Sequence, residues 1–150
     1  MFRDGFARLL VFQLGAERFA VALESVDEVI DAPAVQPLPG ARPAVRGIAA
    51  IHGAMVTVYD ARPLLDVGGG TDAAALLFTR GGRRIALGVD EVFDAIAVAK
   101  GELRAAPHAG AADGVVIGLI RRENELVAVL DANALLDAAT AVTDREGERT

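Results

Sequence analysis

The sequence contains no cysteine, no tryptophan, one tyrosine and only two histidines in 150 residues. The lack of cysteine excludes a disulfide framework, a thiolate nucleophile and a sulfur-ligated metal, and it favours a reducing compartment. The scarce aromatic side chains leave little with which to stack the bases of single-stranded nucleic acid. The formal net charge is −6, because 21 acids outnumber 15 bases, and an acidic surface suits phosphate backbones poorly. We therefore expect no nucleic-acid partner.

Long hydrophobic runs are also missing. The longest uncharged, apolar-rich stretch, residues 47–59, is shorter than the roughly 20 residues that a membrane-spanning helix needs. The start of the chain, MFRDGFARLL, carries charges where a secretory signal peptide has an apolar core. We expect a cytoplasmic protein without direct membrane insertion.

The residue types that catalysis needs are not grouped in the sequence. Ser25 is the only serine and lies in no Gly-x-Ser-x-Gly motif, and His52 and His108 lack the close spacing of a metal-binding pair. Residues 68–70 are glycines, but the Gly-Lys-Ser/Thr of a phosphate-binding loop does not follow them. These patterns predict no enzymatic activity, no metal and no cofactor.

The chain contains an internal repeat. Three pairs of segments share sequence: residues 12–23 with 78–89, residues 55–66 with 126–137, and the VDEV tetrapeptides at 26–29 and 89–92. The second pair has seven identities in twelve positions. A duplication of this kind predicts two halves of similar structure.

Each copy predicts the same elements. Short β-rich runs broken at Gly15 and at Gly81 predict a hairpin in each copy, and a second hairpin follows in each. Asp60 and Asp131 come after the last strand of their copies and precede Ala-x-x-Leu-Leu, which is typical of a residue that caps a short helix.

These signals predict an all-β fold with short helices. Small sheets hide their edges by curling into barrels, and units of about 60 residues are marginal alone, so the two halves are expected to share one core. The predicted parts are an N-terminal tail (1–8), a single domain (9–137) with halves 10–66 and 76–137, a flexible linker (67–75) between them, and a polar C-terminal tail (138–150).

The order of these segments resembles the CheW-like adaptor family of bacterial chemotaxis. The resemblance covers residues 9–137 and rests on LLVFQLGAERFAVALESVDEVI, PLPGARPAVRGIAAIHGAMVTVYDARPLL, RRIALGVDEVFDAI and GVVIGLIRRENELVAVLDANALL. It implies two intertwined five-stranded β-barrels of Src-homology-3 type and a non-catalytic adaptor. The implied partners are the regulatory domain of a CheA-type histidine kinase and the cytoplasmic tip of chemoreceptors, so the adaptor would be recruited to membrane receptor arrays.

The resemblance also implies two sets of binding residues. The kinase-binding residues would be Val26, Glu28, Val29 and Arg104. The groove between the halves that receives the receptor helix would be lined by Leu14, Val35, His52, Val89 and Val92.

The sequence departs from the family pattern at two places. The family signature Asn-Leu-Arg-Gly reads AIHG at residues 50–53. An arginine holds a carboxylate such as Glu28 with two donors, whereas an imidazole offers at most one, so we expect the ion pair of the family to be weakened or replaced. After Arg104 the family has an acidic and an aromatic residue, where this chain has His108 and Ala109, so a second kinase contact lacks two of its usual side chains.

Two other functions fit the same sequence. An adaptor of a non-motility or pilus chemosensory pathway would share the fold but serve its own kinase. A small-molecule-binding barrel domain would instead show a deep pocket with convergent polar groups.

Overall fold

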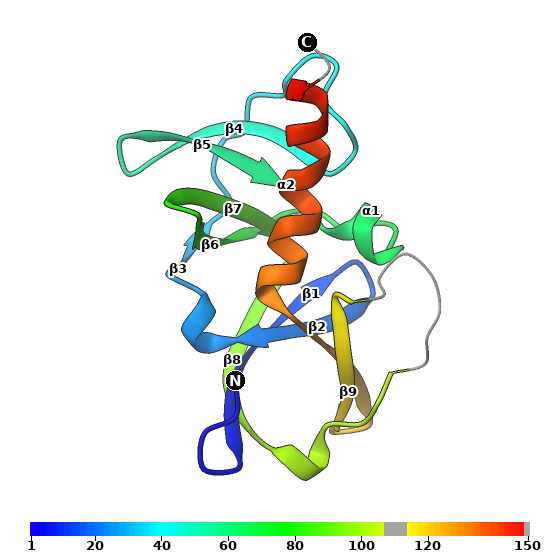
Figure 1. The fold of residues 1–150 in the computed structure, drawn as a ribbon. Helices are drawn as coiled ribbons and strands as arrows, with labels where there is room; N and C mark the ends of the chain where they lie inside the picture. The colour runs from blue at the N-terminus through cyan, green and yellow to red at the C-terminus, as the bar shows by residue number, and fades with distance from the viewer. Residues whose placement is uncertain (107–113, 149–150) are drawn as a thin grey trace.

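Two five-stranded sheets make up most of the protein. The structure is a computed structural model and describes residues 1–106 and 114–148. Sheet A has the strand order β8-β1-β2-β10-β9, and sheet B has the order β3-β6-β7-β5-β4. In Figure 1, sheet B occupies the upper part of the molecule and sheet A the lower part.

The strands of sheet A are β1 (Phe6–Leu14), β2 (Glu17–Ala22), β8 (Glu91–Ala99), β9 (Val116–Arg122) and β10 (Glu125–Leu130). Those of sheet B are β3 (Glu28–Asp31), β4 (Val45–Ile51), β5 (Ala54–Tyr59), β6 (Ala74–Arg80) and β7 (Arg83–Val89). The helical elements are η1 (Leu23–Ser25), α1 (Arg62–Leu65), η2 (Lys100–Glu102) and α2 (Ala132–Glu148).

The sheets exchange hairpins between the two copies of the repeat. The hairpin β1–β2 comes from the first copy but pairs with β8 and β10 of the second, while β6–β7 of the second copy pairs with β3 and β5 of the first. The copies keep the same register, because Thr57 lies opposite Ile85 in one parallel pair and Ala128 lies opposite Phe19 in the other. The all-β, intertwined fold is therefore confirmed.

The sheets are curled, but their strand pairing is open. Among the described strands, β8 is not paired with β9 and β3 is not paired with β4. The term barrel thus describes the curl of each sheet and not a closed ring of hydrogen bonds.

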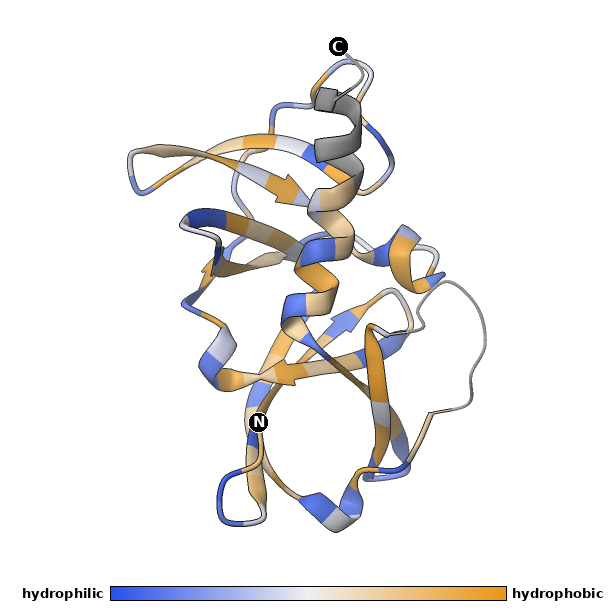
Figure 2. Ribbon diagram, in the orientation of Figure 1, coloured by the Kyte–Doolittle hydropathy of each residue, from blue (hydrophilic) through white to orange (hydrophobic). Residues whose placement is uncertain are grey.

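Three apolar clusters hold the sheets together. The largest lies between the sheets and includes Phe12, Phe78, Tyr59 and residues of α2 such as Leu135. Two smaller clusters fill the inside of sheet A and of sheet B. Alternate residues of a strand enter different clusters, so that on β1 Leu10 and Phe12 pack between the sheets while Leu9 and Val11 pack inside sheet A. Both faces of this strand are therefore buried, and Figure 2 shows hydrophobic residues on every strand.

Both aspartates expected to cap helices accept a backbone N–H in the first turn, although the N-cap residue of α1 is Ala61 and Asp60 lies one position before it. An Asp60 oxygen accepts the backbone N–H of Arg62 at 2.9 Å, at the start of α1. An Asp131 oxygen accepts the backbone N–H of Ala134 at 3.2 Å, at the start of α2. Both carboxylates therefore satisfy N–H groups that lack a partner within the helix.

Two expected boundaries, and the expected flexibility of the linker, differ from the structure. β1 begins at Phe6, inside the predicted N-terminal tail, because residues 6–8 pair with β8. α2 continues through Glu148, and Ala139 in the predicted polar tail is fully buried in the core. The linker expected to be flexible is anchored, because the Thr71 N–H and the Asp72 carboxylate both form hydrogen bonds.

Over the described residues, the structure has no helix that is long and apolar enough to cross a membrane.

Candidate protein-binding surfaces

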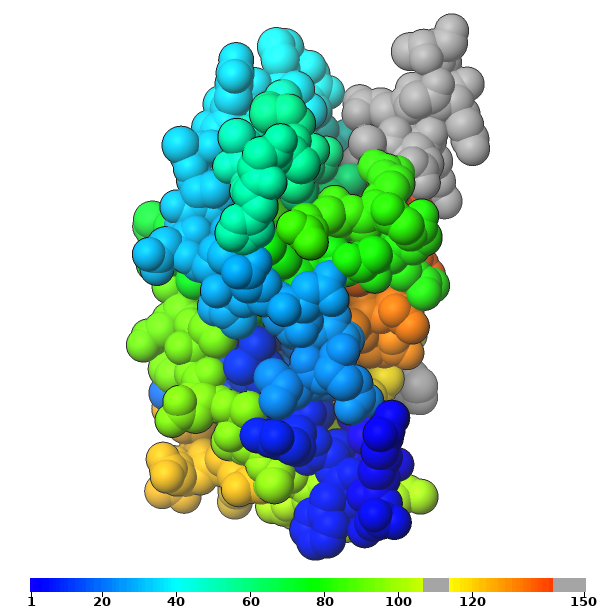
Figure 3. Space-filling view, turned by 90° about the vertical axis from the view of Figure 1, so that its left-hand side faces the viewer, coloured from blue at the N-terminus to red at the C-terminus, as the bar shows by residue number. Residues whose placement is uncertain are grey.

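The first candidate surface lies where β3 meets the tip of the β4–β5 hairpin. We call Val26, Glu28, Val29 and His52 the β3 surface. Glu28 and His52 are joined by a contact of 2.7 Å between Oε2 and Nε2, with side chains 47% and 54% exposed. Val29 beside them is 44% exposed. Figure 3 views the molecule from this side, and the hairpin tip lies above the β3 segment.

Local backbone geometry explains how His52 reaches Glu28. The turn between β4 and β5 consists of His52 and Gly53, both with positive φ (50° and 80°), which is the two-residue turn that suits the twist of a hairpin. β3 is a four-residue edge strand that pairs with β6 alone among the described strands. One imidazole nitrogen therefore links β3, at one edge of sheet B, to the β4–β5 hairpin at the other edge.

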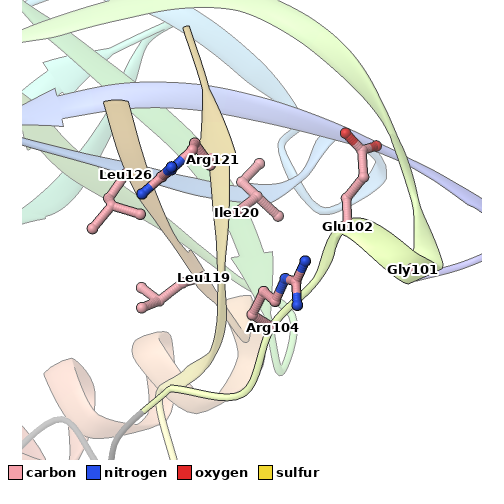
Figure 4. Close-up of a pocket in the computed structure, with 7 residues that line it drawn as sticks. All are labelled: Gly101, Glu102, Arg104, Leu119, Ile120, Arg121 and Leu126. Atoms are coloured by element: carbon pink, nitrogen blue, oxygen red, sulfur yellow. The ribbon is translucent and has the colours of Figure 1, made fainter. Parts of the chain in front are cut away.

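The second candidate surface is a hollow beside η2, which we call the η2 hollow. Its volume is about 520 Å³, and Figure 4 shows its lining: Gly101, Glu102, Arg104, Leu119, Ile120, Arg121 and Leu126. Arg104 is exposed, and its backbone pairs with that of Leu119 through two hydrogen bonds of 2.8 Å. Leu126 is 59% exposed. Two arginines beside exposed leucines suit a partner with apolar and acidic side chains.

The structure disperses the residues expected in a receptor groove. Leu14 and Val89 are fully buried in the core between the sheets, so a partner cannot reach them while the core is intact. Val92 is half-buried against the same core, Val35 is half-buried against the cluster inside sheet B, and His52 belongs to the β3 surface. This corrects the sequence-based placement of Leu14 and Val89, because an apolar residue at a strand end has the same pattern whether it faces a groove or a core.

Sequence reasoning missed a cluster of buried charges around Arg62, which is only 5% exposed. The Arg62 guanidinium donates to Asp60 at 3.1 Å, to Asp72 at 2.8 Å and to Asp90 at 2.5 Å. Arg46 lies within 3.2 Å of Asp60 and 3.3 Å of Asp72. We call these five residues the Arg62 cluster. One signal was available, because Arg62 aligns with the uncharged Asn133 of the second copy.

Hydrogen bonds within the cluster favour the charged forms of Arg62 and Asp90. Burial lowers the pKa of Arg62, but hydrogen bonds to Asp72 and Asp90 outweigh that effect and raise the pKa above its usual value. Burial raises the pKa of Asp90, but hydrogen bonds from the Gly15 N–H, Arg62 and the Thr71 N–H outweigh it and lower the pKa. Arg62 and Asp90 therefore both carry their charge at neutral pH.

Two further observations concern residues singled out in the sequence. His108 and Ala109, which follow Arg104, lie outside the described residues. Within residues 1–106 and 114–148, no group of three or more His, Asp or Glu side chains is arranged to hold a metal ion.

A family model for the CheW-like domain matches residues 8–140, nearly the whole chain. The chain belongs to the CheW-like domain family. The curated chemotaxis protein CheW of Bacillus subtilis (strain 168) is 28% identical over 147 residues, covering 92% of this chain and 94% of that protein. Among solved structures, the scaffolding protein TtCheW from Thermoanaerobacter tengcongensis matches with a TM-score of 0.74 and 20% identity, covering 86% of this chain and 91% of that one. The resemblance seen in the sequence is confirmed, and the CheW fold extends over both sheets.

Proposed function

We propose that this member of the CheW-like family is a non-catalytic adaptor that couples chemoreceptors to a CheA-type histidine kinase in the cytoplasm. Membership of the family supports the adaptor role, and the β3 surface is the observation that carries it. This surface combines an exposed valine, a carboxylate and a short edge strand.

The β3 surface suits the regulatory domain of the kinase. Edge strands with open backbone groups accept partner strands or loops, and short ones do so without promoting general aggregation. Glu28 uses Oε2 for His52, so Oε1 remains able to accept a hydrogen bond from the kinase. Val29 supplies apolar contact area next to that carboxylate. Charge and apolar area together give the mixed composition that protein interfaces have.

The η2 hollow is proposed as a second kinase contact, centred on Arg104. Its leucines supply apolar area and its arginines supply charge. The receptor tip is assigned to the boundary between the two sheets, where Val92 is partly exposed beside the core that the sheets share. Because each contact is modest, simultaneous binding of several partners would raise the effective affinity.

Calorimetric titration of the full chain with the regulatory domain of a CheA-type kinase from the same organism tests this function. Val29→Asp should weaken binding at least about tenfold, because a charge would be buried in the contact. The matched control is Phe6→Asp, which changes an exposed apolar residue in sheet A and should leave the affinity unchanged. The proposal fails if the unmodified chain does not bind the kinase domain, or if both variants weaken binding equally.

A further inference from the structure

The Arg62 cluster joins segments that are far apart in the sequence. Arg46 lies on β4, Asp60 and Arg62 lie at the junction of β5 and α1, Asp72 precedes β6, and Asp90 follows β7. All five residues come from sheet B or its connections. The cluster nevertheless reaches sheet A through Asp90.

Asp90 stands at the crossing from sheet B to sheet A. Its Oδ1 accepts the N–H of Gly15, in the β1–β2 turn, at 2.8 Å and also receives the Arg62 guanidinium. Its Oδ2 accepts the Thr71 N–H at 3.0 Å, and its own N–H donates to the Gln13 carbonyl at 3.0 Å. One carboxylate thus ties the first hairpin of sheet A to α1 and the linker of sheet B.

The corresponding junction in the other copy is built differently. Asn133 and Ile117 occupy the positions of Arg62 and Arg46, and Asp27, which aligns with Asp90, accepts the Thr79 hydroxyl at 2.6 Å. Packing there comes from apolar residues of α2, with an exposed ion pair between Arg80 and Asp137. Apolar packing is non-directional, whereas charge-assisted hydrogen bonds hold their partners at fixed angles. The Arg80–Asp137 pair is also bidentate, but it is exposed and water competes for its partners, whereas Arg62 is buried. The Arg62 side of the molecule is therefore expected to hold the orientation more firmly.

We propose that Arg62 is a positioning residue that fixes the orientation of sheet A on sheet B, so that a partner contacting both sheets meets a preformed surface. Arg62 is buried and does not touch such a partner itself. A preformed surface spares a ligand the cost of ordering it, so loss of the cluster should weaken binding across the sheets and leave binding to one sheet intact. The inference rests on the proposed adaptor function for the choice of partner, a receptor tip at the boundary between the sheets.

The test uses the full chain with Arg62→Gln, which removes the charge and the forked donor. Residual dipolar couplings measured by NMR should fit one common orientation of the two sheets in the unmodified chain and two separate orientations in the variant. Affinity for a soluble receptor-tip hairpin should fall about tenfold, while affinity for the kinase regulatory domain at the β3 surface should stay within about twofold. Arg62→Lys keeps the charge and should recover part of the receptor affinity.

The matched control is Arg80→Gln, which breaks the exposed ion pair at the other junction and should change neither the couplings nor either affinity. If Arg62→Gln does not fold, Asp72→Asn removes one of the three carboxylates and should give a smaller effect of the same kind. One common orientation in these variants, or equal losses of both affinities, would overturn the inference. If the unmodified chain binds neither partner, the adaptor function fails, and the couplings still decide whether Arg62 fixes the orientation.

Discussion

Sheets A and B have equivalent strand orders when the two copies of the repeat are aligned. They differ in the contacts between their two edge strands, which are not paired with each other in either sheet. In sheet B the hairpin tip residue His52 reaches Glu28 on β3. In sheet A the aligned tip residue is Glu123, which lines a hollow of about 290 Å³ together with Asp94 of β8. Arg122 instead donates to the Ala97 carbonyl at 2.6 Å. The same hairpin geometry thus carries an attractive pair at one tip and two acids at the other.

The two copies of the repeat have the same backbone bridge before their second hairpins. The segment before β4 pairs Gln36 with Ile48, and the segment before β9 pairs Arg104 with Leu119 at the aligned position. Each crossing passes over a glycine, Gly47 in one copy and Gly118 in the other. Both copies keep the bridge and the glycine at the crossing, whereas the residues at the hairpin tips differ. The crossings therefore serve the fold that the copies share, and the tips give each sheet a different surface.

The largest effect is expected for Gly47→Ala. A methyl group there would lie 2.1 Å from the Gln36 carbonyl oxygen, and Gly47 has a φ of 147°, which other residues rarely adopt. We expect a loss of about 3 kcal/mol in the free energy of unfolding. Gly118→Ala should cost less, about 2 kcal/mol, because a methyl group there would lie 2.6 Å from the Leu103 side chain and 2.7 Å from the Arg104 carbonyl oxygen, while its φ lies outside the left-handed region. Urea denaturation compares the two, and equal losses would contradict this ranking.

A smaller effect is expected for Asp90→Asn, of about 2 kcal/mol at neutral pH, because Arg62 would lose a charged acceptor. The pKa of Asp90 is lowered from its usual 3.8, so as the pH falls the unfolded chain takes up the proton before the folded chain does. The stabilisation is complete above about pH 4 and is lost as the pH falls through the lowered pKa.

The difference in stability between Asp90→Asn and the unmodified chain should therefore shrink below about pH 4. Thermal unfolding at a series of pH values measures it. Asp27→Asn is the control at the other junction, where the carboxylate is exposed and accepts the Thr79 hydroxyl, and it should cost less stability at neutral pH than Asp90→Asn. A constant difference down to pH 2 would refute the role given to the Asp90 charge.

The smallest effect on stability is expected at the tip. His52→Arg offers Glu28 two donors in place of one, and we expect tighter binding of the kinase domain with a change of about 2 °C or less in the melting temperature. His52→Glu reproduces the acidic tip of sheet A and should weaken that binding. Calorimetric titration checks both variants, and unchanged affinity in each would show that the tip contact is irrelevant to the partner.

Much of the fold could be predicted from the sequence, because apolar runs broken by a glycine turn define hairpins locally. The shared positions of Asp60 and Asp131 likewise predicted both helix starts. The exchange of hairpins between sheets came only from the family resemblance, because no local pattern states which distant strand an edge will pair with.

The candidate site could be predicted less well. Glu28 and Val29 are exposed as expected, but nothing in the sequence distinguished buried Leu14 from a groove residue. Arg62 looked like any charged residue near a turn, and its contacts form only when the segments that carry Asp72 and Asp90 converge on it. The alignment of Arg62 with the uncharged Asn133 marks the position as different, but it does not state which distant segments meet there.

The exchange of hairpins also sets an order of assembly during synthesis. Sheet B needs only residues 28–89, so all of its strands exist once β7 has been made. Sheet A needs Phe6 at one end to pair with Ala99 and Arg18 to pair with Val127, so its first hairpin must wait for the last strand. Pairings this distant along the chain form slowly, and unpaired strand edges promote aggregation in the meantime. The N-terminal hairpin therefore leaves the ribosome well before the strands of sheet A that will flank it.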